Sequence, residues 1–280
     1  MSDFALDHVG VAVNDLDAAA SIYRRLGFTL SDLSHHVDAG APPRRRGTGN
    51  HCIMLRQGYV ELIGVTDPAY QGRLRHHLAR YEGAHIVAFG TTDLATAAAG
   101  LARRGFTAGA PRRLSRPIVE RHRAVTAEFS IVDLPTPVDE GYYIAVEHHT
   151  PDALWQPHLV EHANGAMGLI GVTLCVDEAQ RFAAAMATML DGEHDVANRV
   201  ISLGRTRLHV VDRARLATRF PGVGAPVVPY VAAISLSVGD LARTRAALES
   251  AGIGGRSGPA DSLWVSPGDA RGTVIEFVRK

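Results

Sequence analysis

The chain repeats one pattern four times within its 280 residues. In each copy an apolar run leads to an Asn or Asp, a helix-forming stretch follows, and a glycine closes it. In three copies the Asp and the glycine lie 12 positions apart: Asp15 and Gly27, Asp93 and Gly105, Asp240 and Gly252. The copy at 168–192 is looser and closes at Asp191-Gly192. Such a repeat indicates one supersecondary unit that buries its apolar face against its neighbours.

Each copy predicts the same local structure. The apolar run is typical of a strand, and the Asp after it suits a helix N-cap because its carboxylate accepts from N–H groups of the first turn. Apolar residues at helical spacing predict a helix of about three turns. The glycine allows the left-handed conformation that ends this helix. Two or three strand-like segments follow, so the unit is β-α-β-β-β and the fold class is α+β.

One unit cannot cover the open face of its own sheet, so we expect the four units to pair into two domains, 1–150 and 165–280. The segment between them contains Pro151 and Pro157 and is typical of a linker. The segments 33–50 and 107–124, rich in Pro, Gly and Arg, predict loops over each cup of strands.

Composition excludes several classes of protein. Apolar residues make up 46% and charged residues 21%, which is a normal globular balance. Basic and acidic residues are equal at 29 each, so the chain lacks the basic field of nucleic-acid binders. No apolar run approaches the roughly 20 residues of a membrane span, and the start carries no basic segment of a secretory signal. We therefore expect a cytoplasmic protein whose partner is a small molecule.

The repeated unit, with a His in the first strand and a Glu in the last, resembles the vicinal oxygen chelate superfamily. That group includes glyoxalase I, methylmalonyl-CoA epimerase and extradiol dioxygenases. The similarity lies in 6–13 (LDHVGVAV) and 58–63 (GYVELI), and 47–51 (GTGNH) is similar to glyoxalase-like families in particular. It covers nearly the whole chain and implies four βαβββ modules paired into two domains.

The resemblance implies metal ligands in the first strand and the last strand of each unit. These positions are His8 and Glu61 in the first copy, and His85 and Glu147 in the second. A carboxylate inside an apolar strand is costly to bury unless it is paired or binds a cation. The four residues can meet this need by sharing one divalent metal ion, for which imidazole and carboxylate ligands suit Zn, Ni, Co, Fe or Mn.

Other interpretations of these residues stay open. A single His in a strand is usually a core or surface residue, and a Glu in a short strand usually faces solvent. In addition, His85 lies eight residues before Asp93, whereas His8 lies seven before Asp15. A loop insertion accounts for this difference, but a shift within the strand turns His85 away from the site.

The second domain is predicted to hold no metal of its own. His209 and Glu276 occupy later-strand positions, but Ala233 stands in place of the first-strand His of the fourth copy. We interpret this domain as structural, as a cover for the first cup or an oligomer surface. A homodimer is one arrangement that the superfamily allows.

The predicted reaction is that of a glyoxalase-like lyase or isomerase. A metal with open positions binds both oxygens of a bidentate substrate and stabilises the enediolate formed by loss of an α-proton. The base is then Glu61 or Glu147. Two alternatives remain: an extradiol-type ring-cleaving dioxygenase using Fe(II), and a non-catalytic protein that sequesters a small molecule.

Further residues are candidates for substrate contact. Arginines gather in the two long segments, including Arg44, Arg45 and Arg116, and form either a solvated loop surface or a rim that attracts an anionic substrate. Tyr59 and Tyr143 are expected to point into the same cup. Strand alternation also places His149 inward and His148 outward.

Overall fold

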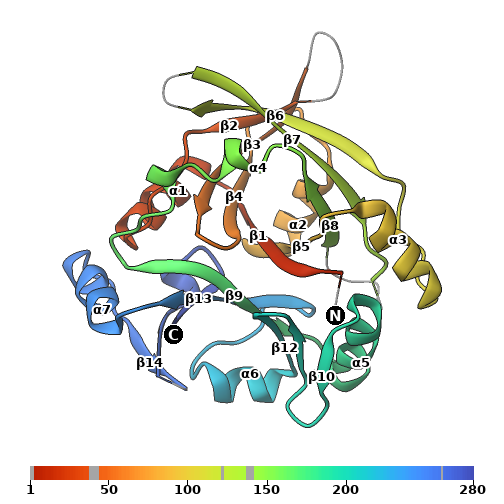
Figure 1. Ribbon diagram of the computed structural model, residues 1–280. Coiled ribbons are helices and arrows are strands. Elements are labelled where there is room, and N and C mark those ends of the chain that lie inside the picture. The colour runs from red at the N-terminus through yellow and green to blue at the C-terminus, as the bar shows by residue number, and fades with distance from the viewer. Residues whose placement is uncertain (1–2, 38–43, 121–122, 137–141, 260) are drawn as a thin grey trace.

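The computed structural model describes residues 3–37, 44–120, 123–136, 142–259 and 261–280 (Figure 1). It contains the four predicted copies, which confirms the α+β fold class. The first copy comprises β1 (Ala5–Val13), α1 (Leu16–Arg25), β2 (Ser34–Val37), β3 (Arg45–Met54) and β4 (Tyr59–Val65). The second comprises β5 (Gly83–Gly90), α3 (Leu94–Arg103), β6 (Arg112–Glu120), β7 (Arg123–Asp133) and β8 (Tyr142–His148).

The remaining copies form the second half of the chain. The third comprises β9 (Ala166–Cys175), α5 (Ala179–Leu190), β10 (Glu193–Asp195), β11 (Val200–Leu203) and β12 (Thr206–Val211). The fourth comprises β13 (Tyr230–Val238), α7 (Leu241–Ser250), β14 (Arg256–Gly258), β15 (Ser262–Val265) and β16 (Val274–Arg279). Short helices α2 (Arg73–Arg80), α4 (Pro151–Leu154) and α6 (Arg213–Arg219) lie in the connections. None of the described helices is long and apolar enough to cross a membrane.

The repeated Asp begins its helix as predicted in three copies. The carboxylate of Asp15 accepts from the Ala18 N–H, that of Asp93 from Ala95 and Thr96, and that of Asp240 from Ala242. The looser third copy differs, because α5 begins without a side-chain cap and ends at left-handed Asp191 instead of a glycine. Local hydrogen bonding therefore accounts for where most of the helices begin.

The eight strands of the first two copies form a barrel. Their order is β1-β4-β3-β2-β6-β7-β8-β5, and pairing of β1 with β5 joins the two ends. The β2–β6 junction, which we call the seam, has a single register pair in the part of the chain that the structure describes, Val37 with Ser115. The segments 33–50 and 107–124 were predicted as loops, but they contribute β2, half of β3 and β6. Extensive pairing of β6 with β7 stabilises these polar strands despite their Pro, Gly and Arg content.

The second half forms an open sheet in the order β10-β11-β12-β9-β13-β16-β15-β14. In Figure 1 the barrel lies above this sheet, and β1 and β9 run close together between them. One register pair, Val231 with Ala84, joins the two into a single 16-stranded sheet. Because the two halves share a sheet, the domain boundaries 1–150 and 165–280 stay a prediction.

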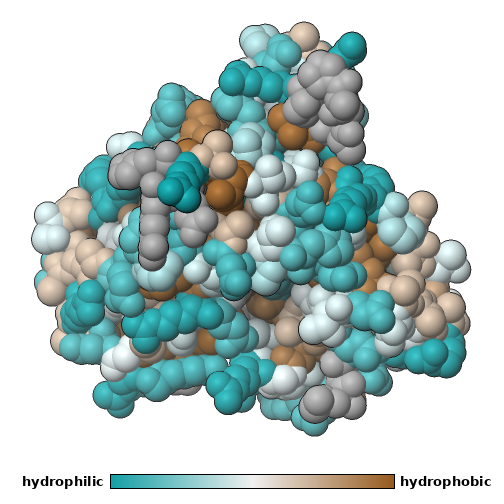
Figure 2. Space-filling view, turned by 45° about the horizontal axis from the view of Figure 1, so that its top comes forward, coloured by the Kyte–Doolittle hydropathy of each residue, from teal (hydrophilic) through white to brown (hydrophobic). Residues whose placement is uncertain are grey.

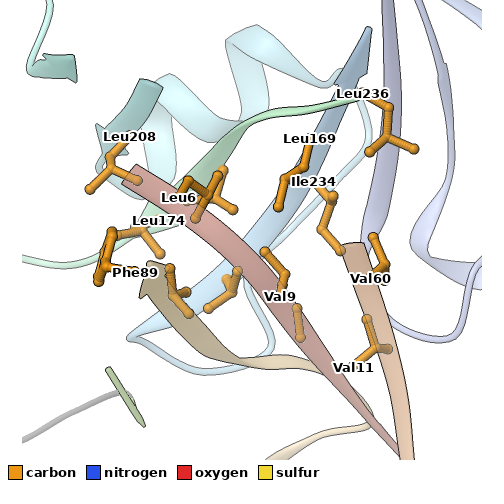
Figure 3. Packing of buried hydrophobic residues seen from close by; sticks show 14 of the residues in the cluster. Leu6, Val9, Val11, Val60, Phe89, Leu169, Leu174, Leu208, Ile234 and Leu236 are labelled. Carbon is orange, nitrogen blue, oxygen red and sulfur yellow. The ribbon is translucent and has the colours of Figure 1, made fainter. Parts of the chain in front are cut away.

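The two halves also share a hydrophobic core (Figure 3). Leu6, Val9 and Val11 on the outer face of the barrel belong to the same buried cluster as residues of the second sheet, including Leu169 and Ile234. Since these side chains occupy the outward positions of β1, the alternate positions are left to line the barrel interior. Hydrophilic residues dominate the face in Figure 2, and its apolar residues lie in small patches.

Candidate functional site

The interior of the barrel contains a cavity of about 330 Å3, which we call the first cup. The neighbouring strands β1 and β4 supply His8, Tyr59 and Glu61 to its wall. In the parallel register His8 pairs with Tyr59, and Gly10 pairs with Glu61. The imidazole of His8 stacks on the Tyr59 ring with centroids 4.4 Å apart. These contacts hold three of the predicted site residues together on one wall.

The carboxylate of Asp7 holds the imidazole of His8 in place. Asp7 Oδ1 lies 2.7 Å from His8 Nδ1 and 3.1 Å from His148 Nε2. Burial raises the pKa of Asp7, but the hydrogen bonds from His148 and His8 outweigh it and hold that pKa well below its ordinary value. Asp7 is therefore an ionised acceptor between two imidazoles, an arrangement that selects which ring nitrogen carries the proton.

Glu61 is also buried and ionised. Its carboxylate accepts a short hydrogen bond from Asn50 Nδ2, and His36 Nε2 lies 3.6 Å from Oε1. His36 in turn contacts Thr48 Oγ1 at 2.8 Å. Burial raises the pKa of Glu61, but His36, with further charge from His8 and Arg116, outweighs that effect and lowers the pKa to about 2. The cup wall thus carries a fixed negative charge.

Arg116 on β6 supplies a buried positive charge. Its side chain is among the few buried charged groups of the described residues, at 5% exposure. Its Nη2 donates a hydrogen bond to Cys52 Sγ at 3.3 Å, and its Nε has no hydrogen-bond partner among the described residues. A thiol is a weak acceptor, so the guanidinium keeps donors available for an anion.

The mouth of the first cup is also basic. Arg46, Arg73 and Arg112 line it. The Arg73 guanidinium lies 4.1 Å from the centre of the Tyr142 ring, and Arg112 pairs with Asp133 at 2.6 Å. Arg46 and Arg112 belong to the two arginine-rich segments predicted to form a rim, whereas Arg73 lies outside them. Arg44 and Arg45 are exposed and do not line this cavity, whereas Arg121, a further arginine of the segment 107–124, lies outside the described residues.

Two of the four predicted metal ligands point elsewhere. On β8 the cavity-lining positions are Tyr142, Ile144 and Val146, so alternation turns Glu147 outward. Its Oε2 accepts from the Leu94 N–H at the start of α3, at 3.1 Å. Tyr143 shares that outward face, and its ring centroid lies 6.3 Å from that of Phe182. The expected orientations of His148 and His149 are reversed for the same reason.

His85 is displaced by a bulge. Val11 pairs with Ala84 and Gly10 with Ile86, which leaves His85 as the extra residue of β5. Its ring stacks between His77 and Tyr81, with centroids 4.8 and 3.8 Å away, and Nε2 lies 2.9 Å from the Tyr81 carbonyl oxygen. Burial lowers the pKa of His85 to about 4. His85 lies eight residues before Asp93, whereas His8 lies seven before Asp15. This one-residue difference thus comes from a shift within the strand and not from a loop insertion.

The residues of the first cup do not fit the predicted four-ligand metal ion. His8 and Glu61 lie on one wall, but His85 and Glu147 belong to other surroundings. No group of three or more His, Cys, Asp or Glu side chains within the described residues has the geometry to hold a metal ion.

The second half has a cavity of about 880 Å3, which His209, Arg207 and Arg219 help to line. Glu276 lies buried beside it and accepts from Arg219 Nη2 at 2.9 Å and from Ser235 Oγ at 2.6 Å. The guanidinium of Arg219 and the hydroxyl of Ser235 together compensate the charge of this buried carboxylate.

The sequence did not predict the roles of several residues in or next to the first cup: Asp7, His36, Asn50 and His148, and the buried role of Arg116. Asp7 adjoins a predicted ligand, yet strict alternation places it on the opposite face. Asn50 and His36 lie in a segment predicted as a loop. The run of polar residues at 48–51 just before an apolar strand was the available indication.

Comparisons with known proteins agree with this architecture. A family model described as a glyoxalase-like domain matches residues 6–190, well over half of the chain. The chain belongs to this glyoxalase-like family. The predicted relationship to the vicinal oxygen chelate superfamily is thereby confirmed. No curated protein matches the sequence at a significant level.

Solved structures show the same fold at low sequence identity. A hypothetical protein from Staphylococcus aureus has a TM-score of 0.64 and 9% identity, covering 99% of this chain and 100% of that one. A xylose isomerase-like TIM barrel/4-hydroxyphenylpyruvate dioxygenase fusion protein has a TM-score of 0.63 and 14% identity, over 100% of this chain and 49% of that one. A mutant 4-hydroxymandelate synthase from Streptomyces coelicolor has a TM-score of 0.62 and 15% identity, over 100% and 93%.

Proposed function

We propose that the protein is a lyase or isomerase that removes a proton next to a carbonyl group of a small anionic substrate in the first cup. The observation that carries this proposal is the Asp7–His8 pair, with Nδ1 of His8 2.7 Å from the buried Asp7 carboxylate. Because Nδ1 donates to Asp7, Nε2 of His8 is the nitrogen left to accept a proton. His8 replaces Glu61 and Glu147 as the proposed base.

Glu61 has a different role in this proposal. Its pKa of about 2 makes it a poor proton acceptor near neutral pH. Its carboxylate is instead suited to accept a hydrogen bond from a substrate hydroxyl group, while Asn50 and His36 hold it in place. Arg116 and the arginines of the mouth favour a substrate that carries a carboxylate or another anionic group.

Solvent hydrogen exchange tests the proposal without knowledge of the natural substrate. The protein is incubated in heavy water with a series of 2-oxo acids, and NMR follows deuterium entering at C3. We expect exchange with the unaltered protein and a loss of about 100-fold or more in His8→Asn. His149→Asn is the matched control, because His149 lies outside the cup and contacts Ser130.

The alternatives give different results in the same experiment. Ligand binding without exchange supports the non-catalytic protein and overturns the proposed reaction. Exchange that survives in His8→Asn overturns the role of His8. The ring-cleaving dioxygenase remains the other enzymatic alternative, and oxygen-dependent loss of a catechol would support it against the proposal.

A further inference from the structure

A second cavity, of about 440 Å3, lies at the seam of the barrel. Among the described residues, the strands β2 and β6 have one register pair, Val37 with Ser115, and other residues of both strands line the cavity. The linker between the two halves, including α4, also contributes to its lining, with Leu154, Gln156 and Leu159 among its residues. Its lining is largely apolar: Leu30, Leu33, Met54, Ile118, Leu154 and Leu159.

Arg116 lies at the boundary between the first cup and this seam cavity. It lines both of them, together with Val37, whereas Cys52 lines the seam cavity only. The Arg116 guanidinium is therefore the one buried cation that borders both spaces among the described residues. Its Nε has no partner there, and its hydrogen bond to the Cys52 sulfur is a weak one. An anion at this position would satisfy donors that are otherwise costly to bury.

The seam cavity also has an apolar rim. The described residues include three exposed large hydrophobic side chains, and two of them, Leu33 at 43% and Val119 at 50%, line this cavity. Arg45 and Asp32 line it too, with opposite charges. An apolar rim that leads to a single buried cation fits a molecule with an apolar chain and one anionic end.

We propose that the seam cavity holds the apolar tail of the substrate, whose carboxylate is bound by Arg116 at the edge of the first cup. The substrate class is thus a carboxylic acid with an extended aliphatic or aromatic tail. This inference rests on the proposed function only in placing the ligand in the first cup.

Calorimetric titration with octanoate, 1-octanol and acetate tests this assignment. Octanoate should bind the unaltered protein at least about tenfold more tightly than either other probe, because octanol lacks the charge and acetate lacks the tail. Arg116→Met should abolish the preference for octanoate over octanol, and Arg116→Lys should retain part of it. Thermal melting establishes that each variant is folded.

The rim supplies a second test that leaves the buried arginine intact. Val119→Asp and Leu33→Asp should each weaken octanoate binding about tenfold or more. Val196→Asp is the matched control, because Val196 is 57% exposed and lies in the second half. Equal binding of octanoate by all three variants would overturn the inference, as would equal affinity for octanoate and octanol in the unaltered protein.

Failure of this inference can be separated from failure of the proposed function. His8→Asn should keep the octanoate affinity within about twofold while losing hydrogen exchange, because His8 does not line the seam cavity. Octanoate binding without exchange in any 2-oxo acid supports the ligand class and overturns only the reaction. If the rate of deuterium exchange does not depend on the length of the tail of the 2-oxo acid, only the proposed ligand class is overturned.

Discussion

Asp7 and His8 are consecutive residues of one strand, and yet their side chains meet, with Oδ1 and Nδ1 2.7 Å apart. A β-bulge makes this contact: Leu6 pairs with Phe89 and His8 with Ala88, so Asp7 has no partner of its own. In a regular strand the two side chains would point to opposite faces. The bulge therefore gives His8 an anionic partner that regular alternation denies it.

Asp7→Asn is expected to lower kcat for hydrogen exchange by roughly 100-fold while changing KM little, because Asp7 orients His8 but does not line the first cup. Steady-state kinetics by NMR, with melting temperature as a control, checks this. A rise in KM with unchanged kcat would show that Asp7 serves ligand binding and would contradict its positioning role.

Glu61→Gln should alter the dependence of stability on pH. The pKa of Glu61 is about 2 in the folded protein, below its ordinary value of 4.5. Its ionised form therefore stabilises the fold fully above about pH 4.5, and this contribution falls as the pH approaches 2. We expect the variant to lose up to about 3 kcal/mol near neutral pH and to show a flatter acid dependence. Urea unfolding across this pH range measures both effects.

His85→Phe should make the protein less sensitive to mild acid. The pKa of His85 is about 4 in the fold against an ordinary 6.5, because burial disfavours the charged ring. The unfolded chain binds its proton first, so stability is full above about pH 6.5 and falls between 6.5 and 4. The phenyl ring keeps the stacking on Tyr81 and has no proton to gain. Hydrogen exchange activity should be unchanged, whereas a metal ligand at this position would make it fall.

Leu169→Ala should destabilise the whole chain and not the second half alone. Leu169 is fully buried in the cluster that also contains Leu6 and Val9 of the barrel. Truncation of such a side chain costs about 2–5 kcal/mol. Calorimetry should show one transition at a lower temperature, since the core is shared. Two separate transitions, with only one of them shifted, would indicate independent domains.

The repeat and the cup were largely predictable, but the site was predicted only in part. His8, Glu61 and Tyr59 lie on one wall because β1 and β4 are regular where they pair. His85 and Glu147 were assigned by analogy between copies, and that analogy fails when one strand shifts by a single residue. Arg116 was assigned to a rim because its segment was taken for a loop, and strand pairing places it in the interior instead.

The sequence by itself determined the four units, the Asp that begins three of the helices and the glycine that ends them. Each of these features depends on hydrogen bonds or backbone angles within a few residues, so residues close together in the sequence are enough to predict it. Only the tertiary structure decided which strand residues face the cup and where the barrel has its seam. Those outcomes depend on bulges and on pairing between distant strands, and one extra residue in a strand is enough to turn a side chain from the cavity to the opposite face.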